Sequence, residues 1–92
     1  MSSESNTIFI GKKPPMNYVL AVITAFSNSN NKEVVLKARG QAITTAVDVA
    51  EISRRRFLKD LTVQKISLGT DIVEQEEGGS RNVSTIEITL AV

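Results

Sequence analysis

The sequence predicts an α/β domain of the two-layer α+β type, with the element order β-α-β-α-β-β. Two β-rich runs are each followed by a segment with helical apolar spacing, and two long β-rich runs around a Gly-Gly turn close the chain. A chain of 92 residues is long enough to bury one core and too short for two. We therefore expect a single domain over residues 1–92, in which two helices cover one face of a four-stranded mixed sheet.

The first half of the chain supplies a strand, a helix and a second strand. Residues 7–10 form a short β-rich run that ends at Gly11. The two prolines at 14 and 15 favour a loop followed by a first helical turn, where the missing amide hydrogen of proline does no harm. Apolar residues then recur at helical spacing over 16–26, and residues 33–39 form the second strand.

The second half supplies a longer helix over residues 41–58 and a hairpin. The strands of the hairpin are expected over residues 62–74 and 83–90, and the polar, glycine-containing segment 75–81 forms the turn between them. The apolar residues of each strand alternate with polar ones, so they share one face. The tip of the hairpin should project from the domain, because the apolar content fades there.

The second helix has more apolar surface than one contact with the sheet requires. The stripe expected to face the sheet consists of Ile43, Val47, Ala50 and Phe57. Val49 and Ile52 lie off this stripe, roughly on the opposite flank of the helix. We interpret Val49 and Ile52 as a dimer interface, most simply that of a two-fold homodimer. The alternative is that both residues contact the first helix.

The composition argues against an enzyme and against a membrane protein. The chain has no cysteine and no histidine, which removes thiolate ligands, the commonest zinc ligand and the commonest general base. We therefore expect no catalytic residue, no metal site and no cofactor. The polar N-terminus lacks the apolar segment of a secretory signal, and no apolar run is long enough to span a bilayer. Residues 1–6 are expected to be disordered.

The basic residues are unevenly distributed, although the formal net charge is only +1. Residues 1–46 carry five basic and two acidic side chains, a balance of +3, and residues 47–92 carry six and eight, a balance of −2. Lys12 and Lys13 lie between a strand end and a helix start, where ammonium groups and a helix N-terminus both favour phosphate. This pair is the first candidate for binding nucleic acid. The alternative is a solvated loop whose lysines only aid solubility.

Three further basic segments give weaker signals. Lys37 and Arg39 alternate along a strand and project from one face, as a second basic site or as ordinary surface charges. The three arginines at 54–56 fan apart on a helix, and we expect one or two of them to pair with Glu51 or Asp60. The hairpin tip carries Arg81, a candidate for entering a DNA minor groove. The acidic residues of the same tip, which repel phosphate, are Glu74, Glu76 and Glu77.

Taken together, several segments resemble the Alba family of archaeal chromatin proteins over about residues 8–90. These segments are residues 10–14 (IGKKP), 16–20 (MNYVL), 37–43 (KARGQAI), 46–48 (AVD) and 83–88 (VSTIEI). The resemblance implies a fold like the C-terminal domain of bacterial translation initiation factor three. It also implies a homodimer, or a heterodimer with a paralogue, that coats and compacts double-stranded DNA with little sequence preference and also binds RNA. Such a protein would be cytoplasmic and associated with the chromosome, with no membrane partner.

The resemblance also assigns roles to individual positions. Lys12, Lys13 and Arg39 match nucleic-acid-binding positions of the family. Asn17, Arg81 and Asn82 complete the set of residues that we expect to bind nucleic acid. Lys12 matches a lysine whose acetylation weakens binding, which implies a deacetylase as a further partner, and Phe57 matches an aromatic residue that joins neighbouring dimers. The chain departs from the family pattern at Gln41, Thr45, Gly79 and Asn82, where relatives often have basic residues, and it lacks a basic C-terminal tail. These departures weaken the hairpin contact and suggest a divergent paralogue. Alternatives to DNA compaction are a protein that acts on structured RNA, a nucleic-acid enzyme and an adaptor that binds no nucleic acid.

Overall fold

The computed structural model describes residues 6–28 and 31–92 and has the predicted order of elements. The elements are β1 (Thr7–Phe9), α1 (Pro15–Asn28), β2 (Glu33–Arg39), α2 (Ala42–Ile52), a π-helical turn η2 (Ser53–Phe57), β3 (Thr62–Glu74) and β4 (Ser80–Ala91). Five of the six residues for which we expected disorder, 1–5, lie outside the described part of the chain. The sixth, Asn6, donates a side-chain hydrogen bond of 3.1 Å to the carbonyl of Glu33.

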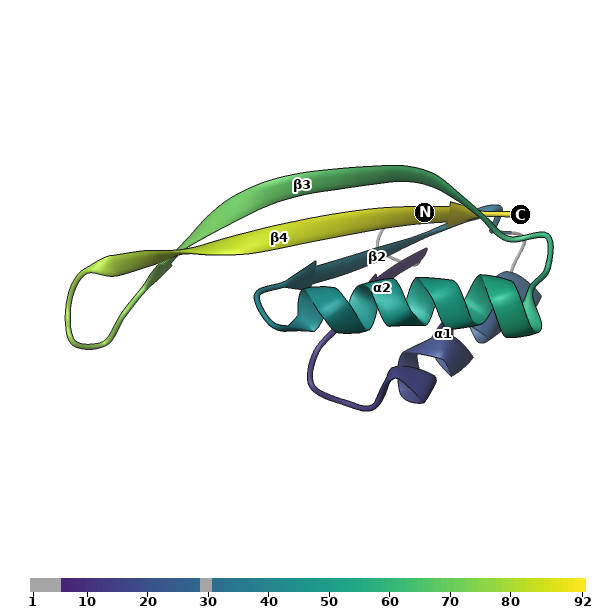
Figure 1. Cartoon of the computed structure of the whole chain (residues 1–92), viewed down its shortest axis with the longest axis horizontal. Coiled ribbons are helices and arrows are strands. Elements are labelled where there is room, and N and C mark those ends of the chain that lie inside the picture. Colours follow the sequence, from purple (N-terminus) through teal and green to yellow (C-terminus); the bar gives the residue numbers. More distant parts are fainter. Residues whose placement is uncertain (1–5, 29–30) are drawn as a thin grey trace.

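The four strands form one mixed sheet in the order β1-β2-β4-β3. β1 runs parallel to β2, whereas β4 is antiparallel to both β2 and β3. Figure 1 shows both helices on the same side of this sheet, as the sequence predicts. The opposite side, which we call the open face, carries no helix in the described part of the chain. No helix in residues 6–28 or 31–92 has the length and apolar character needed to cross a membrane.

The core lies between the sheet and the two helices. Its fully buried members include Leu36 from β2, Leu90 from β4 and Val19 from α1. The side of α2 that faces this core consists of Ala46, Val49 and Ala50 and continues to Ser53 in η2, a spacing of three and four residues.

The predicted phase of the second helix is therefore correct for Ala50 and Ile43, which lie in or against the core, and wrong for Val47, Val49 and Phe57. Val49 is fully buried within the chain, and it cannot contact a partner subunit. Val47 and Phe57, which were expected to face the sheet, are 43% and 45% exposed. The error arises because the apolar residues of this helix cover a wide arc, leaving only a polar arc of Thr44, Asp48 and Glu51, so the sequence supports two stripes. The buried side includes Ala50 of the predicted stripe, together with Ala46 and Val49, which that stripe left out.

The hairpin of β3 and β4 extends past the rest of the sheet. The pairing of β2 with β4 ends at Arg39 and Thr85, whereas β3 and β4 remain paired as far as Glu74 and Ser80. Residues 70–84 therefore form an arm of two strands that projects from the body (Figure 1). The chain reverses at the tip through Gly78 and Gly79, whose φ angles of +94° and +79° favour glycine. The arm is longer than predicted, because the polar residues 80–82 belong to β4.

One row of apolar side chains on β3 has no cover. Ile66 and Leu68 pair with Ile88 and Ile86 of β4, so they lie on the same face as these buried residues. The sharing of a face by the apolar residues of each strand is confirmed. However, β3 is the edge strand beyond the helices, and Ile66, Leu68 and Ile72 are 57%, 80% and 72% exposed.

Candidate nucleic-acid interface

The parallel pairing of β1 and β2 places the basic candidates at one edge of the sheet. The amide of Ile10 donates a hydrogen bond of 2.8 Å to the carbonyl of Lys37, so β1 ends beside the last residues of β2. Residues 11–14, which we call the lysine loop, leave the sheet next to Arg39. Gly40 then turns the chain with a φ of +58°, and its amide donates to the carbonyl of Ser84 in β4 over 2.8 Å. The lysine loop, the end of β2 and the base of the arm therefore share this edge.

The lysine loop presents two free cations. Lys12 and Lys13 are exposed, and neither pairs with an acidic side chain of the described residues. No acidic residue occurs in the sequence between Ser5 and Lys32. Their positive potential is therefore not reduced by a neighbouring carboxylate. Exposed ammonium groups in this setting attract phosphate through a water-screened Coulomb interaction.

Tyr18 of α1 holds the lysine loop in place. Its phenolic Oη accepts hydrogen bonds from the amides of Gly11, at 2.9 Å, and Lys13, at 3.1 Å. Gly11 permits this approach, since a Cβ at that position would lie 3.3 Å from the same oxygen. The amide of Asn17 donates to the carbonyl of Pro14 over 3.0 Å at the start of α1. Both ends of the loop are thus fixed to one helix.

Sequence reasoning missed the role of Tyr18. A half-buried tyrosine one turn into an amphipathic helix looks like an ordinary core residue. The available signal was the combination of a glycine seven residues earlier with a single tyrosine in the chain. A phenolic oxygen that accepts two bonds still has its own hydrogen to donate. The hydroxyl therefore remains a donor at the edge of the candidate interface.

Arg39 lies on the open face, where it pairs with a carboxylate. Its Nη1 is 3.9 Å from Oδ2 of Asp71 on β3, and Nζ of Lys37 is 3.7 Å from Oε2 of Glu87 on β4. All four side chains are between 41% and 63% exposed. Exposed pairs of this length contribute little stability and open readily. The projection of Lys37 and Arg39 from one face is confirmed, but each charge has a partner that the sequence did not reveal.

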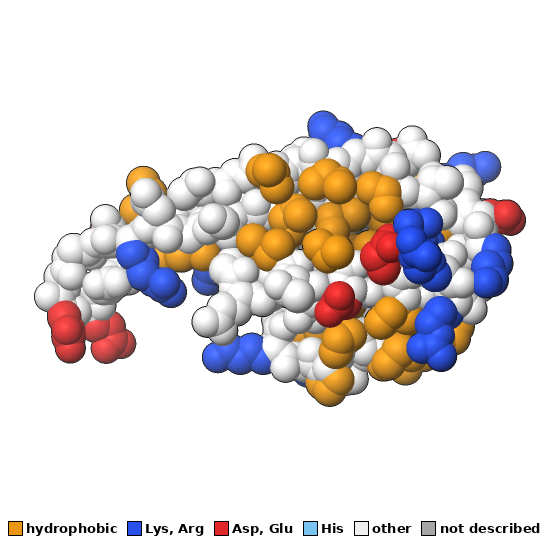
Figure 2. Space-filling model, viewed as in Figure 1, with side chains coloured by type: hydrophobic (Ala, Val, Ile, Leu, Met, Phe, Trp, Pro, Cys, Tyr) orange, Lys and Arg blue, Asp and Glu red, His pale blue; other side chains and the backbone are white. Residues whose placement is uncertain are grey.

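The arm carries basic and acidic side chains at different positions. Arg81 and Asn82 are exposed and lie opposite Val73 and Ile72 in the hairpin. Figure 2 shows acidic side chains at the tip of the arm and basic ones nearer to the body. It also shows a hollow between the arm and the body, with basic side chains on both of its sides. Arg81 therefore belongs to the strand beneath the tip and not to the turn itself.

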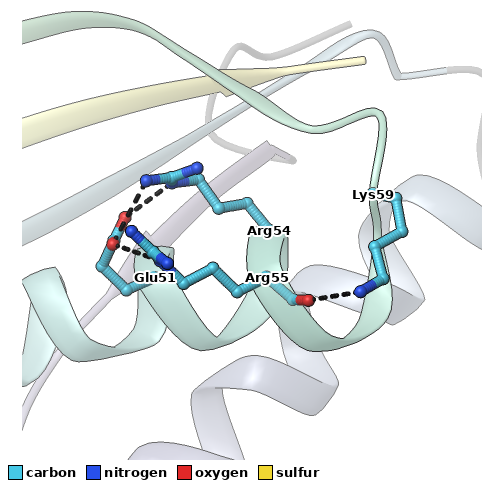
Figure 3. A network of polar contacts seen from close by, with 4 residues as sticks. All are labelled: Glu51, Arg54, Arg55 and Lys59. Carbon is cyan, nitrogen blue, oxygen red and sulfur yellow. Dashed lines mark hydrogen bonds and ion pairs between the residues drawn. The ribbon is translucent and has the colours of Figure 1, made fainter.

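The three arginines of η2 form a separate cluster at the other end of the body. Nε of Arg54 donates to Oε2 of Glu51 over 2.6 Å, and Nε of Arg55 donates to Oε1 over 2.8 Å (Figure 3). The Nζ of Lys59 donates to the carbonyl of Arg55 over 2.7 Å. The expected pairing of these arginines with Glu51 is confirmed. Two of the three guanidinium groups are thereby partly neutralised, and the pKa of the Glu51 carboxyl is lowered, chiefly by the hydrogen bond from Arg54.

The described residues offer no arrangement typical of a metal centre. Among residues 6–28 and 31–92, no three acidic side chains lie together in a way that could hold a metal ion. What the edge of the sheet presents is a pair of exposed lysines on a fixed loop, beside an arm with one arginine. This arrangement can bind a phosphate backbone by charge. It includes no helix placed to enter a groove and recognise the base sequence there.

Comparison with known proteins gives matches over most of the chain. A family model described as Alba matches residues 6–70. The chain is 55% identical over 89 residues to "DNA/RNA-binding protein Alba" of Thermoplasma acidophilum, covering 97% of this chain and 98% of that protein. It is 57% identical over 86 residues to "DNA/RNA-binding protein Alba 1" of Archaeoglobus fulgidus, covering 94% of each chain.

Solved structures extend the comparison to the fold. The structure of Alba from Thermoplasma volcanium superposes with a TM-score of 0.88 at 54% identity and covers 95% of this chain and 100% of that one. The structure of ALBA1 from Trypanosoma brucei gives a TM-score of 0.72 at 26% identity, covering 98% of this chain and 71% of that one. The predicted fold class is thereby confirmed.

We predict that the Tyr18→Phe substitution loosens the lysine loop without unfolding the domain. Each lost hydrogen bond should lower the free energy of unfolding by about 0.5–1.5 kcal/mol. Hydrogen exchange measured by NMR should accelerate roughly 2- to 10-fold at the amides of Gly11 and Lys13. Amides in the middle of α1 serve as the internal control and should keep their rates. Unchanged exchange at Gly11 and Lys13 would show that the hydroxyl does not hold the loop.

We also predict that the Glu51 carboxyl titrates below the ordinary glutamate range, because both arginines stabilise its charged form. A lowered folded pKa means that the ion pairs stabilise the fold above the unfolded pKa. This contribution disappears as the pH falls through the folded pKa. An NMR titration of the carboxyl carbon measures the midpoint. Arg54→Ala should raise it, whereas Arg56→Ala, which removes a cation without a hydrogen bond to Glu51, should leave it nearly unchanged.

Proposed function

This chain belongs to the Alba family, and from that premise we propose that it binds duplex DNA and RNA through their phosphate backbones. The relatives at 52–57% identity carry the name DNA/RNA-binding protein. They cover nearly the whole of this chain. The absence of histidine and cysteine from the sequence is in keeping with a binding protein.

The observation that supports this proposal most strongly is the lysine loop. Lys12 and Lys13 are exposed, lack acidic partners among the described residues and sit on a backbone fixed by Tyr18. A fixed backbone reduces the entropy that must be lost when the two ammonium groups meet phosphates. Phosphates replace their condensed counterions with the lysines, and the release of these ions supplies the free energy of binding. Binding of this kind depends steeply on salt and hardly on sequence.

The arm and its neighbours form the second part of the proposed contact. Arg81 and Asn82 reach toward the minor groove, while Arg39 and Asn17 flank the lysine loop. The acidic side chains of the tip oppose deep insertion, because they would approach phosphates on both sides of the groove. The arm therefore adds less free energy than the loop does. The hollow between the arm and the body, with basic side chains on both of its sides (Figure 2), would then lie against the duplex.

A second copy of the chain would cover the uncovered row on β3. Leu68, Ile66 and Ile72 form an apolar strip, which Figure 2 shows continuing toward α2. Exposed Val47 and half-buried Ile52 lie on that helix. A contiguous apolar surface of this kind in a small domain favours self-association. We propose a dimer whose interface is this strip. Of the two interface residues predicted from the sequence, Ile52 remains in the interface, and residues of β3 take the place of the buried Val49.

Dimerisation doubles the number of lysine loops and permits compaction. Phe57, which is 45% exposed at the end of η2, is available to join neighbouring dimers along the DNA. Acetylation of Lys12 would remove one cation from each loop and weaken binding, so a deacetylase would restore it. The chain would then act at the chromosome in the cytoplasm. The acidic residues of the arm favour pairing with a more basic paralogue as well as with an identical copy.

We predict that replacing both Lys12 and Lys13 by Ala lowers the affinity for a blunt DNA duplex roughly 10- to 100-fold at low salt. The slope of log affinity against log salt should become shallower by up to about 4 for a dimer, since each lysine neutralises about one phosphate. A gel-shift titration across salt concentrations measures both quantities. The matched control is the double change Lys32→Ala and Lys59→Ala at the opposite end of the body. Equal losses in the two double variants would contradict a specific role of the lysine loop.

We predict that Leu68→Asp converts the dimer to a monomer. Burying one leucine at an interface contributes about 1.5–3 kcal/mol, and a carboxylate at the centre of an apolar strip adds a desolvation penalty. Light scattering after size exclusion measures the mass, and circular dichroism checks that the fold is retained. The control is Ser67→Asp, which adds the same charge to the open face of the same strand. A dimeric Leu68→Asp variant would exclude the proposed interface.

A further inference from the structure

The open face of the sheet carries an exposed aromatic ring beside two cations. Phe9, on the edge strand β1, is 69% exposed, whereas its neighbour Ile10 is buried on the helix side. Phe9 is the register partner of Lys37, so the two side chains lie next to each other on the open face. An isolated exposed phenylalanine on a polar sheet surface contributes nothing to this core. Its ring is therefore available to contact a ligand beside Lys37.

The residues around Phe9 form a shallow depression of about 400 Å³ across all four strands. Its side chains on the open face are Phe9, Lys37, Arg39, Asp71, Thr85 and Glu87. They comprise a π-face at one edge, two cations, two carboxylates and one hydroxyl. The volume falls in the range of sites that bind a small organic group such as one nucleotide.

The chemistry of this depression matches an unpaired nucleobase. An aromatic ring stacks on any base, and cations bind the adjacent phosphates. The carboxylates of Asp71 and Glu87 accept hydrogen bonds from exocyclic amines, as in the pairing of Asp or Glu with cytosine N4. The ion pairs that now occupy these groups are 3.7 and 3.9 Å long and well exposed, so a ligand can open them at little cost. A base in a duplex could not stack here, because its two faces already contact neighbouring bases.

We propose that the open face binds an unpaired nucleobase of an RNA or DNA strand, stacked on Phe9 and framed by Lys37 and Arg39. The site is distinct from the lysine loop, which contacts only backbone. This proposal rests on the proposed binding of nucleic acid. It adds that the protein prefers nucleic acid with an unpaired strand to a fully paired duplex. A second copy of the chain is not the expected occupant of this surface. Four charged side chains surround the one ring, which makes the surface too polar to pack against the apolar strip of another copy.

The direct test uses fluorescence, since the sequence contains no tryptophan. In the Phe9→Trp variant the introduced indole is the only one in the chain. Its emission should be quenched by a duplex that carries a short unpaired tail, and much less by the same duplex with blunt ends. Ribose and deoxyribose versions of the tail distinguish RNA from DNA as the source of the base. Equal quenching by blunt and tailed duplexes would overturn the proposal.

Binding measurements supply the second readout. The wild-type protein should bind the tailed duplex more tightly than the blunt one, and Phe9→Ala should reduce affinity for the tailed duplex roughly 5- to 150-fold. Phe9→Leu keeps an apolar side chain without a ring, and it should lose the preference as Phe9→Ala does. Both variants should fold normally, because the side chain is exposed. A tail preference that survives either substitution would count against stacking on Phe9.

The two proposals fail in distinguishable ways. Loss of the tail effect with intact binding of the blunt duplex rejects only the site on the open face. Failure of the wild-type protein to bind either duplex rejects nucleic-acid binding as such. The Lys12 and Lys13 double variant separates the sites further: it should weaken both duplexes while keeping the ratio between them.

Discussion

The unequal lengths of the four strands determine most of the surface properties of this protein. β1 has three residues and β2 has seven, whereas β3 and β4 have thirteen and twelve. The two helices pack over β2, and α2 reaches β4, so the helix layer covers only the short side of the sheet. The surplus length of β3 and β4 becomes the arm at one end, and the uncovered apolar strip on β3 appears along the edge. A domain with strands of equal length would have neither feature.

Whether a basic side chain is neutralised depends on whether the fold brings an acidic side chain close to it. On the open face the strands run side by side, so Lys37 and Arg39 meet Glu87 and Asp71 across the sheet. In η2 the helical spacing brings Glu51 to Arg54 and Arg55. The lysine loop leaves the sheet and is held by a neutral hydroxyl, which satisfies its amides without adding a negative charge. The loop therefore keeps its full positive charge in a chain whose net charge is close to zero.

The sequence predicts the elements better than it predicts which way their side chains face. β2 and β3 have the predicted bounds, because alternation and the flanking turn residues mark their ends unambiguously. The side of the second helix that faces the core was predicted correctly at Ala50 and wrongly at Val47 and Val49, since apolar residues cover a wide arc of that helix and Ala46 carries a weak hydrophobic signal. Tyr18 and Phe9 were missed for another reason: their roles depend on contacts between segments that only the folded chain brings together. The exposure of Lys12 and Lys13 could be predicted, because a loop between a strand and a helix needs no tertiary partner to expose them.

The proposed phosphate site and the proposed base site are adjacent because of the way β1 ends. Phe9 lies in the sheet with its ring on the open face, and Lys12 lies three residues later in the loop at the edge. Three residues of extended chain span about 10 Å, so a single strand of nucleic acid can contact both positions. On these proposals the edge would bind any backbone, whether the bases are paired or not, whereas the open face would accept a base only where pairing has ended. A protein with this geometry would coat a duplex uniformly through its edges and bind more tightly where a strand becomes single. The fixed position of the loop, set by Tyr18, keeps the two sites in register along one strand.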